Sequence, residues 1–97
     1  MKNTTFDAYV IDTLMPDLVG HDRQPAAFLL YLHLAHRVGR AHSARASLRE
    51  LAADTGLSKT AVQRAVRTLV RRRLLKVEKQ SPTAIPQYSV LRPWIRR

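Results

Sequence analysis

The longest run of apolar positions in the chain predicts a buried helix over residues 25–38. Apolar side chains occupy almost every side of this stretch, which is typical of a helix packed between several neighbours. Pro25 suits the first turn, where a missing backbone N–H costs nothing, and Gly39 suits the end of a helix. We therefore expect this helix to form the centre of the core. Its surplus of apolar sides also indicates a second contact surface.

Upstream, residues 6–19 place apolar side chains at mixed steps of three and four residues. This spacing predicts one or two short helical turns, interrupted near Pro16, which cannot donate a backbone hydrogen bond. Gly20 is expected to end them. We expect residues 1–22 to form an N-terminal segment that packs on the core or on a dimer partner, and residues 23–97 to form the main domain.

Two further helices are predicted with a short turn between them. Ser47 and Glu50 have the spacing of a capping box, in which each residue bonds the backbone N–H of the other. Gly56 is free to adopt the left-handed conformation that ends such a helix, and Leu57 is expected as a buried plug. Ser58 then caps a helix over about 58–72. Four side chains are expected on its inner side: Val62, Val66, Leu69 and Val70.

After Leu75 the hydrophobic period changes from about 3.6 residues to 2, as in strands. Two alternating runs, around Val77 and around Tyr88, predict a hairpin over about 76–91 with a proline-containing loop. Residues 40–46 are expected to be a basic linker. The predicted fold class is mainly α with a small β-hairpin: a three-helix core, a two-stranded wing and an extra N-terminal segment.

The charge is strongly positive and unevenly distributed. The 97 residues carry 17 Lys and Arg against 7 Asp and Glu, a formal net charge of +10. Residues 1–22 carry a net charge of −3 and residues 23–97 a net charge of +13. Cations also gather on the polar side of the helix at 58–72. A basic domain of this kind attracts polyanions, of which nucleic acid is the commonest.

The stretch from Ser47 to Leu91 resembles the winged helix-turn-helix family of bacterial regulators, including MarR-like, GntR-like and replication-initiator-like domains. The resemblance implies a helix, a second helix, a recognition helix and a wing, in that order. It departs from the family after the recognition helix, where members usually have glycine and this chain has Arg73. Either Arg73 adopts a strained conformation there or the helix ends differently.

This resemblance implies sequence-specific binding of double-stranded DNA, with helix 58–72 in the major groove. By position, three residues are candidates for contacts with bases: Thr60, Gln63 and Arg64. Nine residues are candidates for contacts with phosphates: Ser47, Arg49, Ser58, Lys59, Arg67, Arg71, Lys79, Ser81 and Thr83. The role expected is that of a transcriptional regulator from a bacterium, phage or plasmid.

A single reading helix recognises few base pairs, so a homodimer is expected. Surfaces available for it are the N-terminal segment, the helix at 25–38, and Trp94 with Ile95. Three alternatives stay open: a protein-interaction winged helix that docks an acidic partner, a replication or partition accessory protein, and an RNA binder.

Other function classes find no support in the sequence. The chain has no cysteine, which suits a reducing cytoplasm and excludes thiolate metal sites. His33 and His36 share a helical spacing that suits a metal, but no further ligand completes a site, so no metal or cofactor is expected. No catalytic motif, membrane span or small-molecule pocket is legible, and the protein is not expected to be an enzyme.

Overall fold

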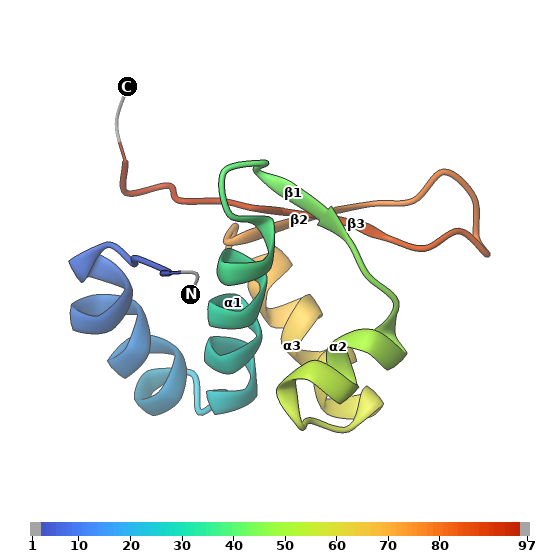
Figure 1. Ribbon diagram of the computed structural model, residues 1–97. Coiled ribbons are helices and arrows are strands. Elements are labelled where there is room, and N and C mark those ends of the chain that lie inside the picture. Colours follow the sequence, from blue (N-terminus) through green and yellow to red (C-terminus); the bar gives the residue numbers. More distant parts are fainter. Residues whose placement is uncertain (1–2, 96–97) are drawn as a thin grey trace.

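The computed structural model describes residues 3–95, and Figure 1 shows how the elements are arranged. An N-terminal helical segment packs beside α1, while α2 and α3 lie on the other side of α1 below a small sheet. In chain order the elements are η1 (Val10–Leu14), η2 (Pro16–His21), α1 (Pro25–Val38), β1 (Ser43–Arg45), α2 (Leu48–Thr55), α3 (Lys59–Arg71), β2 (Leu75–Glu78) and β3 (Gln87–Val90).

Helix α1 is the centre of the core, as its apolar pattern predicts. Pro25 is its first residue, and Gly39 follows its last turn with a φ of 52°. The side chains of Leu30 and Leu34 are fully buried, and Leu29 is 48% exposed. The helix therefore packs against η2, α2, α3 and the sheet with most of its circumference, and leaves Pro25 and Leu29 toward solvent.

The turn between α2 and α3 forms as the sequence predicts. Ser47 and Glu50 make the complete capping box, and Gly56 adopts a left-handed φ of 79°. The side chain of Ser58 accepts a hydrogen bond from the Ala61 N–H at the start of α3. Leu57 is only partly buried, although it packs against the core. These local signals set the angle at which α3 leaves the turn.

The inner side of α3 differs from the prediction at one position. Val62 and Leu69 are fully buried, and Val66 is partly buried. Val70, by contrast, is 44% exposed, and Thr68 is buried at 5% exposure in its place. The prediction for Val70 was wrong because the contacts of α3 with α1 and β2 follow the side of the helix that carries Thr68 and Leu69.

The end of α3 decides between the two conformations left open for Arg73. Arg73 adopts a positive φ of 58°. Its N–H donates to the Val70 carbonyl at 3.0 Å, and the Leu74 N–H donates to the Leu69 carbonyl at 2.8 Å. This pair of bonds defines a Schellman motif, in which glycine usually occupies the left-handed position. Arg73 therefore accepts a backbone conformation that costs a side-chain-bearing residue about 1 kcal/mol.

The wing is part of a three-stranded antiparallel sheet with the order β1-β3-β2. β2 pairs with β3 from Leu75 opposite Val90 to Glu78 opposite Gln87, which confirms the hairpin. The prediction of a linker over residues 40–46 was wrong at its centre, because Ser43–Arg45 pairs with the other edge of β3. These three residues show no alternation of apolar and polar side chains that would predict a strand. They form one only because they pair with β3.

The N-terminal segment is helical, with wide turns of the π type in η1 and η2. The helical path continues through Met15 into Pro16, the first residue of η2, so the predicted interruption near Pro16 was wrong. Gly20 does not end the segment, since η2 extends to His21. Its buried side chains, Val10, Leu14 and Leu18, belong to the same core as α1. No helix within residues 3–95 has both the length and the apolar character needed to cross a membrane.

Candidate nucleic-acid interface

Helix α3 presents its polar side to solvent along its whole length. Six side chains on this side are exposed: Lys59, Thr60, Gln63, Arg64, Arg67 and Arg71. None of its four cations forms an ion pair within residues 3–95. The carboxylates that do form ion pairs with Arg or Lys contact other cations: Asp7 with Arg92, Asp17 and Asp22 with Arg72, Glu50 and Asp54 with Arg37, and Glu78 with Lys76. The positive charge of α3 is therefore available to a polyanion.

The carboxylate of Glu50 occupies the N-terminus of α2. Glu50 Oε1 accepts the Ser47 N–H at 3.2 Å, and Ser47 Oγ accepts the Glu50 N–H at 3.1 Å. The hydrogen bond from the Ser47 backbone, followed by that from Arg37, lowers the pKa of Glu50 below its usual value. The Ser47 hydroxyl keeps its own proton to donate, and Arg49 beside it is exposed.

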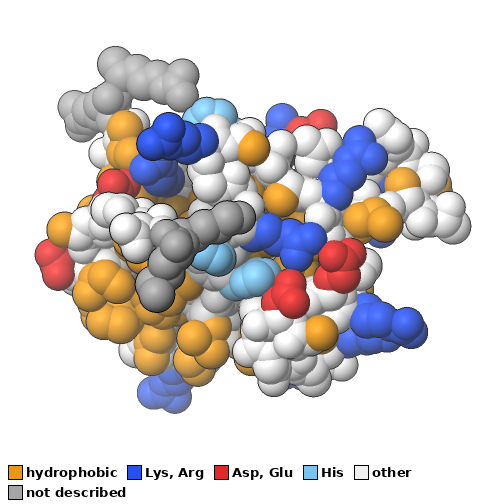
Figure 2. Space-filling model, viewed as in Figure 1, with side chains coloured by type: hydrophobic (Ala, Val, Ile, Leu, Met, Phe, Trp, Pro, Cys, Tyr) orange, Lys and Arg blue, Asp and Glu red, His pale blue; other side chains and the backbone are white. Residues whose placement is uncertain are grey.

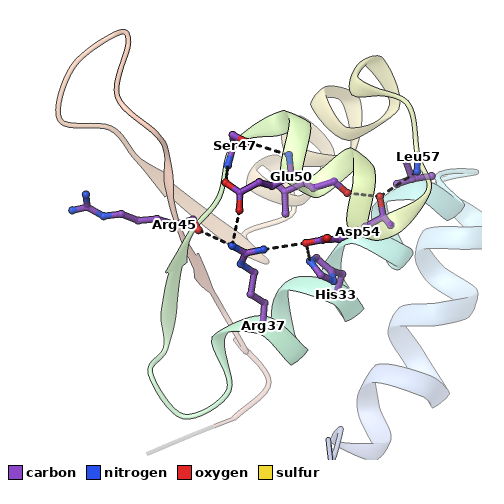
Figure 3. A network of polar contacts seen from close by, with 9 residues as sticks. His33, Arg37, Arg45, Ser47, Glu50, Asp54 and Leu57 are labelled. Carbon is purple, nitrogen blue, oxygen red and sulfur yellow. Dashed lines mark hydrogen bonds and ion pairs between the residues drawn. The ribbon is translucent and has the colours of Figure 1, made fainter.

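Arg37 of α1 holds α2 in place through three hydrogen bonds, each of 3.1 Å (Figure 3). Its guanidinium donates to the carboxylates of Glu50 and Asp54 and to the backbone carbonyl of Arg45. A planar guanidinium can serve several acceptors in fixed directions at once. Arg37 therefore fixes α1, the end of β1 and α2 relative to one another.

His33 lies one turn before Arg37 and faces the carboxylate of Asp54. Its Nε2 is 3.5 Å from Asp54 Oδ2 and has no hydrogen-bond partner within residues 3–95. Desolvation lowers the pKa of His33, an effect that Asp54 opposes and that Arg37 and His36 reinforce. His33 and His36 do not converge on a common site, because His36 bonds the Thr4 hydroxyl.

The wing and α3 together border a groove of about 520 Å³. Its cationic and polar lining comes from both sides, with Gln63 and Arg67 from α3 and Lys79 and Thr83 from the wing loop. Ser47 at the start of α2 also lines it. The structure thus brings five of the predicted site residues around one groove.

The other predicted residues lie outside this groove. Lys59, Thr60 and Arg64 lie on the first two turns of α3, Arg71 on its last turn, and Arg49 on α2. Ser81 is exposed in the wing loop, and the Ser58 side chain is used as the α3 cap.

Two features of the structure were not predicted from the sequence. A second cavity, of about 810 Å³, lies between the N-terminal residues, the end of α1 and the end of β3. No sequence motif predicts this cavity, because its lining comes from four separate segments. Ligand atoms of Asp17, His21 and Asp22 also lie within 4.8 Å of one another. Arg72 contacts both of these carboxylates, so their charge is already compensated by the protein.

Comparisons with known proteins agree with this geometry. Residues 24–75 match the family model described as a helix-turn-helix domain. Among solved structures, the chain is similar to the AntR antimony-specific transcriptional repressor, with a TM-score of 0.51 and 19% sequence identity. That alignment covers 95% of this chain and 74% of the repressor chain, and at such an identity it concerns the fold alone. A comparison with curated protein sequences finds no match.

Proposed function

Since this chain belongs to the family of helix-turn-helix domains and is therefore a DNA-binding regulator, we propose that it reads specific duplex sequences with α3 in the major groove. The observation that carries the proposal is the exposed side of α3, whose four cations have no carboxylate partner within residues 3–95. A helix of this kind fits the width of the major groove, where each base pair presents a distinct pattern of donors and acceptors.

Base contacts are proposed for Thr60, Gln63 and Arg64, which lie on the first two turns of α3. Glutamine can bond the edge of adenine in two places, and arginine can bond guanine in the same way. A good contact of either kind is worth about 1–3 kcal/mol of discrimination against the wrong base. These three side chains are therefore proposed to determine the preferred sequence.

Phosphate contacts are proposed for the residues that flank this group. Arg67 and Lys79 border the groove between α3 and the wing, so a strand of the duplex passing there would meet cations on both sides. The remaining candidates surround that path: Ser47, Arg49, Ser58, Lys59, Arg71, Ser81 and Thr83. Such contacts position the protein on DNA and carry no sequence information.

Selection of bound sequences from random duplexes tests the proposal. The ratio of dissociation constants for the selected and a scrambled duplex is then measured for four proteins. The double change Gln63→Ala with Arg64→Ala is expected to reduce that ratio at least tenfold, because it removes base contacts. Arg71→Ala is expected to weaken both duplexes about equally.

Arg45→Ala serves as the matched control, since Arg45 is an exposed cation on β1 away from α3. It is expected to leave the ratio unchanged. All affinities should fall steeply with salt, because phosphate contacts release counterions. If the double change leaves the ratio unaltered, the assignment of α3 as the reading helix is wrong.

We also propose that the protein acts as a homodimer through the exposed side of its N-terminal segment. Ile11, Met15 and Val19 recur every four residues there and are 44%, 39% and 40% exposed. Figure 2 shows apolar side chains gathered over this part of the molecule. Two-fold symmetry would place two copies of α3 in successive major grooves, one helical turn apart.

Sedimentation velocity tests the dimer. Met15→Asp combined with Val19→Asp is expected to give a monomer that keeps its circular dichroism spectrum. Ile85→Asp is the control, because Ile85 is a similarly exposed apolar residue on the wing loop. A wild-type monomer at micromolar concentration would contradict the proposal.

The proposed absence of catalysis and the proposed location in the cell both follow from a regulator that acts by binding DNA. We propose that the chain has no catalytic role and acts in the cytoplasm, where its DNA target lies. The antimony response named for the similar repressor is not carried over, because soft ions prefer thiolate ligands and these 97 residues contain no cysteine.

A further inference from the structure

The second cavity described above lies at the end of the sheet away from the wing loop. It measures about 810 Å³, which is within the range of small-molecule sites. Its walls are the residues before η1, the last turns of α1, the turn at 39–42 and the end of β3. β3 runs from Gln87 beside the wing loop to Val90, which lines the cavity, so the length of this strand lies between the wing loop and the cavity. Figure 1 shows the course of β3.

The lining of this cavity is rich in basic side chains. Arg37, Arg40, Arg92, His36 and His42 contribute to it, and Asp7 is the single carboxylate among its lining residues. Apolar surface completes the wall: Phe6, Val10, Tyr31, Ala35, Val38 and Val90. Tyr31 is 1% exposed and its hydroxyl is bonded to the Leu91 carbonyl at 3.0 Å, so the apolar surface open to a ligand comes from the partly buried Phe6, Ala35 and Val90.

Two of the basic side chains have no partner in the described part of the chain. Arg40 and His42 form no side-chain hydrogen bond or ion pair within residues 3–95, and both are exposed. Arg92 pairs with Asp7 at 3.4 Å, in an exposed arrangement of the kind that contributes little stability. His42 also adopts a positive φ of 71°, and residues held in such conformations often belong to ligand sites.

DNA binding does not account for these charges, because they lie away from α3 and the wing loop. We infer that the cavity is a binding site for a small organic anion, in which a carboxylate or phosphate group meets Arg40 and Arg92 and an apolar body lies against Phe6 and Val90. Charge-assisted hydrogen bonds from arginine are the strong polar contacts available to such a group.

The site is connected to the DNA-binding part of the molecule through Arg37. This residue lines the cavity and also bonds Glu50 and Asp54 of α2. An anion that attracts its guanidinium would compete with those carboxylates and so act on the position of α2.

The single tryptophan provides a signal for binding. Trp94 Nε1 donates to Asp7 Oδ2 at 3.1 Å, and the Trp94 ring stacks on Tyr9 with 4.6 Å between centroids. Asp7 lines the cavity and pairs with Arg92. A ligand that takes over Arg92 changes the surroundings of Asp7, and therefore the fluorescence of Trp94.

Titration of the wild-type protein with phenylacetate, phenyl phosphate and the neutral phenylacetamide tests the inference, with calorimetry and Trp94 fluorescence as readouts. At least one of the two anions is expected to bind saturably and at least tenfold more tightly than the amide, and the tighter of the two identifies the preferred head group. Arg40→Gln and Arg92→Gln are each expected to weaken the anion at least fivefold.

Arg45→Gln removes the same charge from a residue that does not line the cavity, and is expected to leave binding unchanged (Figure 3 shows its side chain pointing away from the network). The inference is overturned if neither anion binds saturably, or if the affinity for the tighter anion is less than ten times the affinity for the amide. It is also overturned if Arg45→Gln weakens binding as much as Arg40→Gln. Because Arg40 is exposed and unpartnered, its variant is expected to fold, which circular dichroism verifies.

Discussion

Arg72 ends α3 and reaches the N-terminal segment, where its Nε lies 3.5 Å from Asp22 Oδ2. The same guanidinium pairs with Asp17 on η2. Asp22 is only 16% exposed at its side chain, so this contact is partly shielded from water. The end of the proposed reading helix is therefore fixed to the segment that carries Ile11, Met15 and Val19, the apolar residues proposed to form the dimer contact.

Arg72→Gln is expected to lower the free energy of unfolding by about 1–2 kcal/mol, between the values typical of exposed and of buried ion pairs. Urea denaturation measures this change. Arg71→Gln is the matched control, since Arg71 is the neighbour of Arg72 in the sequence, and its side chain is exposed and forms no ion pair within residues 3–95. The control should keep the stability of the wild type and lose affinity for DNA, and equal stabilities of the two variants would contradict the role of Arg72.

Arg73→Gly is expected to stabilise the protein by about 0.5–1 kcal/mol. Glycine adopts the left-handed conformation of the Schellman motif without the steric cost that Arg73 bears at a φ of 58°. The free energy of unfolding in guanidinium gives the comparison. Arg73→Lys keeps the charge and the strained conformation, and should bring no gain. A lysine variant as stable as the glycine variant would show that the backbone is not the source of the effect.

The stability of the protein is expected to fall as the pH drops below about 6.5, the ordinary pKa of histidine. Burial lowers the pKa of His33, so the unfolded chain takes up a proton at a higher pH than the folded one. Protonation therefore favours unfolding between the two pKa values. Thermal unfolding at pH 7.5 and at pH 5.5 measures the loss.

His33→Gln should reduce this pH dependence, because it removes the group whose pKa burial lowers. An identical pH dependence in wild type and in His33→Gln would assign the loss to other groups.

Arg37→Lys is expected to destabilise the protein by about 1–2 kcal/mol, although it conserves the charge. An ammonium group cannot hold Glu50, Asp54 and the Arg45 carbonyl in the fixed directions that the guanidinium serves. Chemical denaturation provides the value. Arg40→Lys, three residues further on, replaces an exposed arginine that has no side-chain partner among residues 3–95, and should have no effect. If both variants match the wild type, the three hydrogen bonds contribute no net stability.

Local signals in the sequence were sufficient for the helices and for the hairpin. Ser47 with Glu50, Gly56, and Ser58 each satisfy or permit a backbone geometry within their own turn, and each does so in the structure. The alternation around Val77 and Tyr88 also predicted its strands, and one residue of each, Leu75 in β2 and Tyr88 in β3, is buried. Where a residue's environment is set by its near neighbours, the sequence predicts it.

The features that the sequence did not predict depend on distant partners. Ser43–Arg45 becomes a strand only because β3 offers a free edge. Val70 is exposed because α1 and β2 cover the adjacent side of α3. The large cavity joins Phe6, Arg40 and Arg92 from separate parts of the chain. No local pattern encodes such meetings, and the proposed contacts of α3 with DNA stay predictions.

The position of β3 in the sheet has a consequence for synthesis of the protein. Both β1 and β2 precede β3 in the chain, yet each finds its partner only in β3. Neither strand can be paired until Val90 has emerged from the ribosome, so the nascent chain carries two open strand edges until then. A premature stop codon or a proteolytic cut just before Gln87 would deprive both strands of their partner at once.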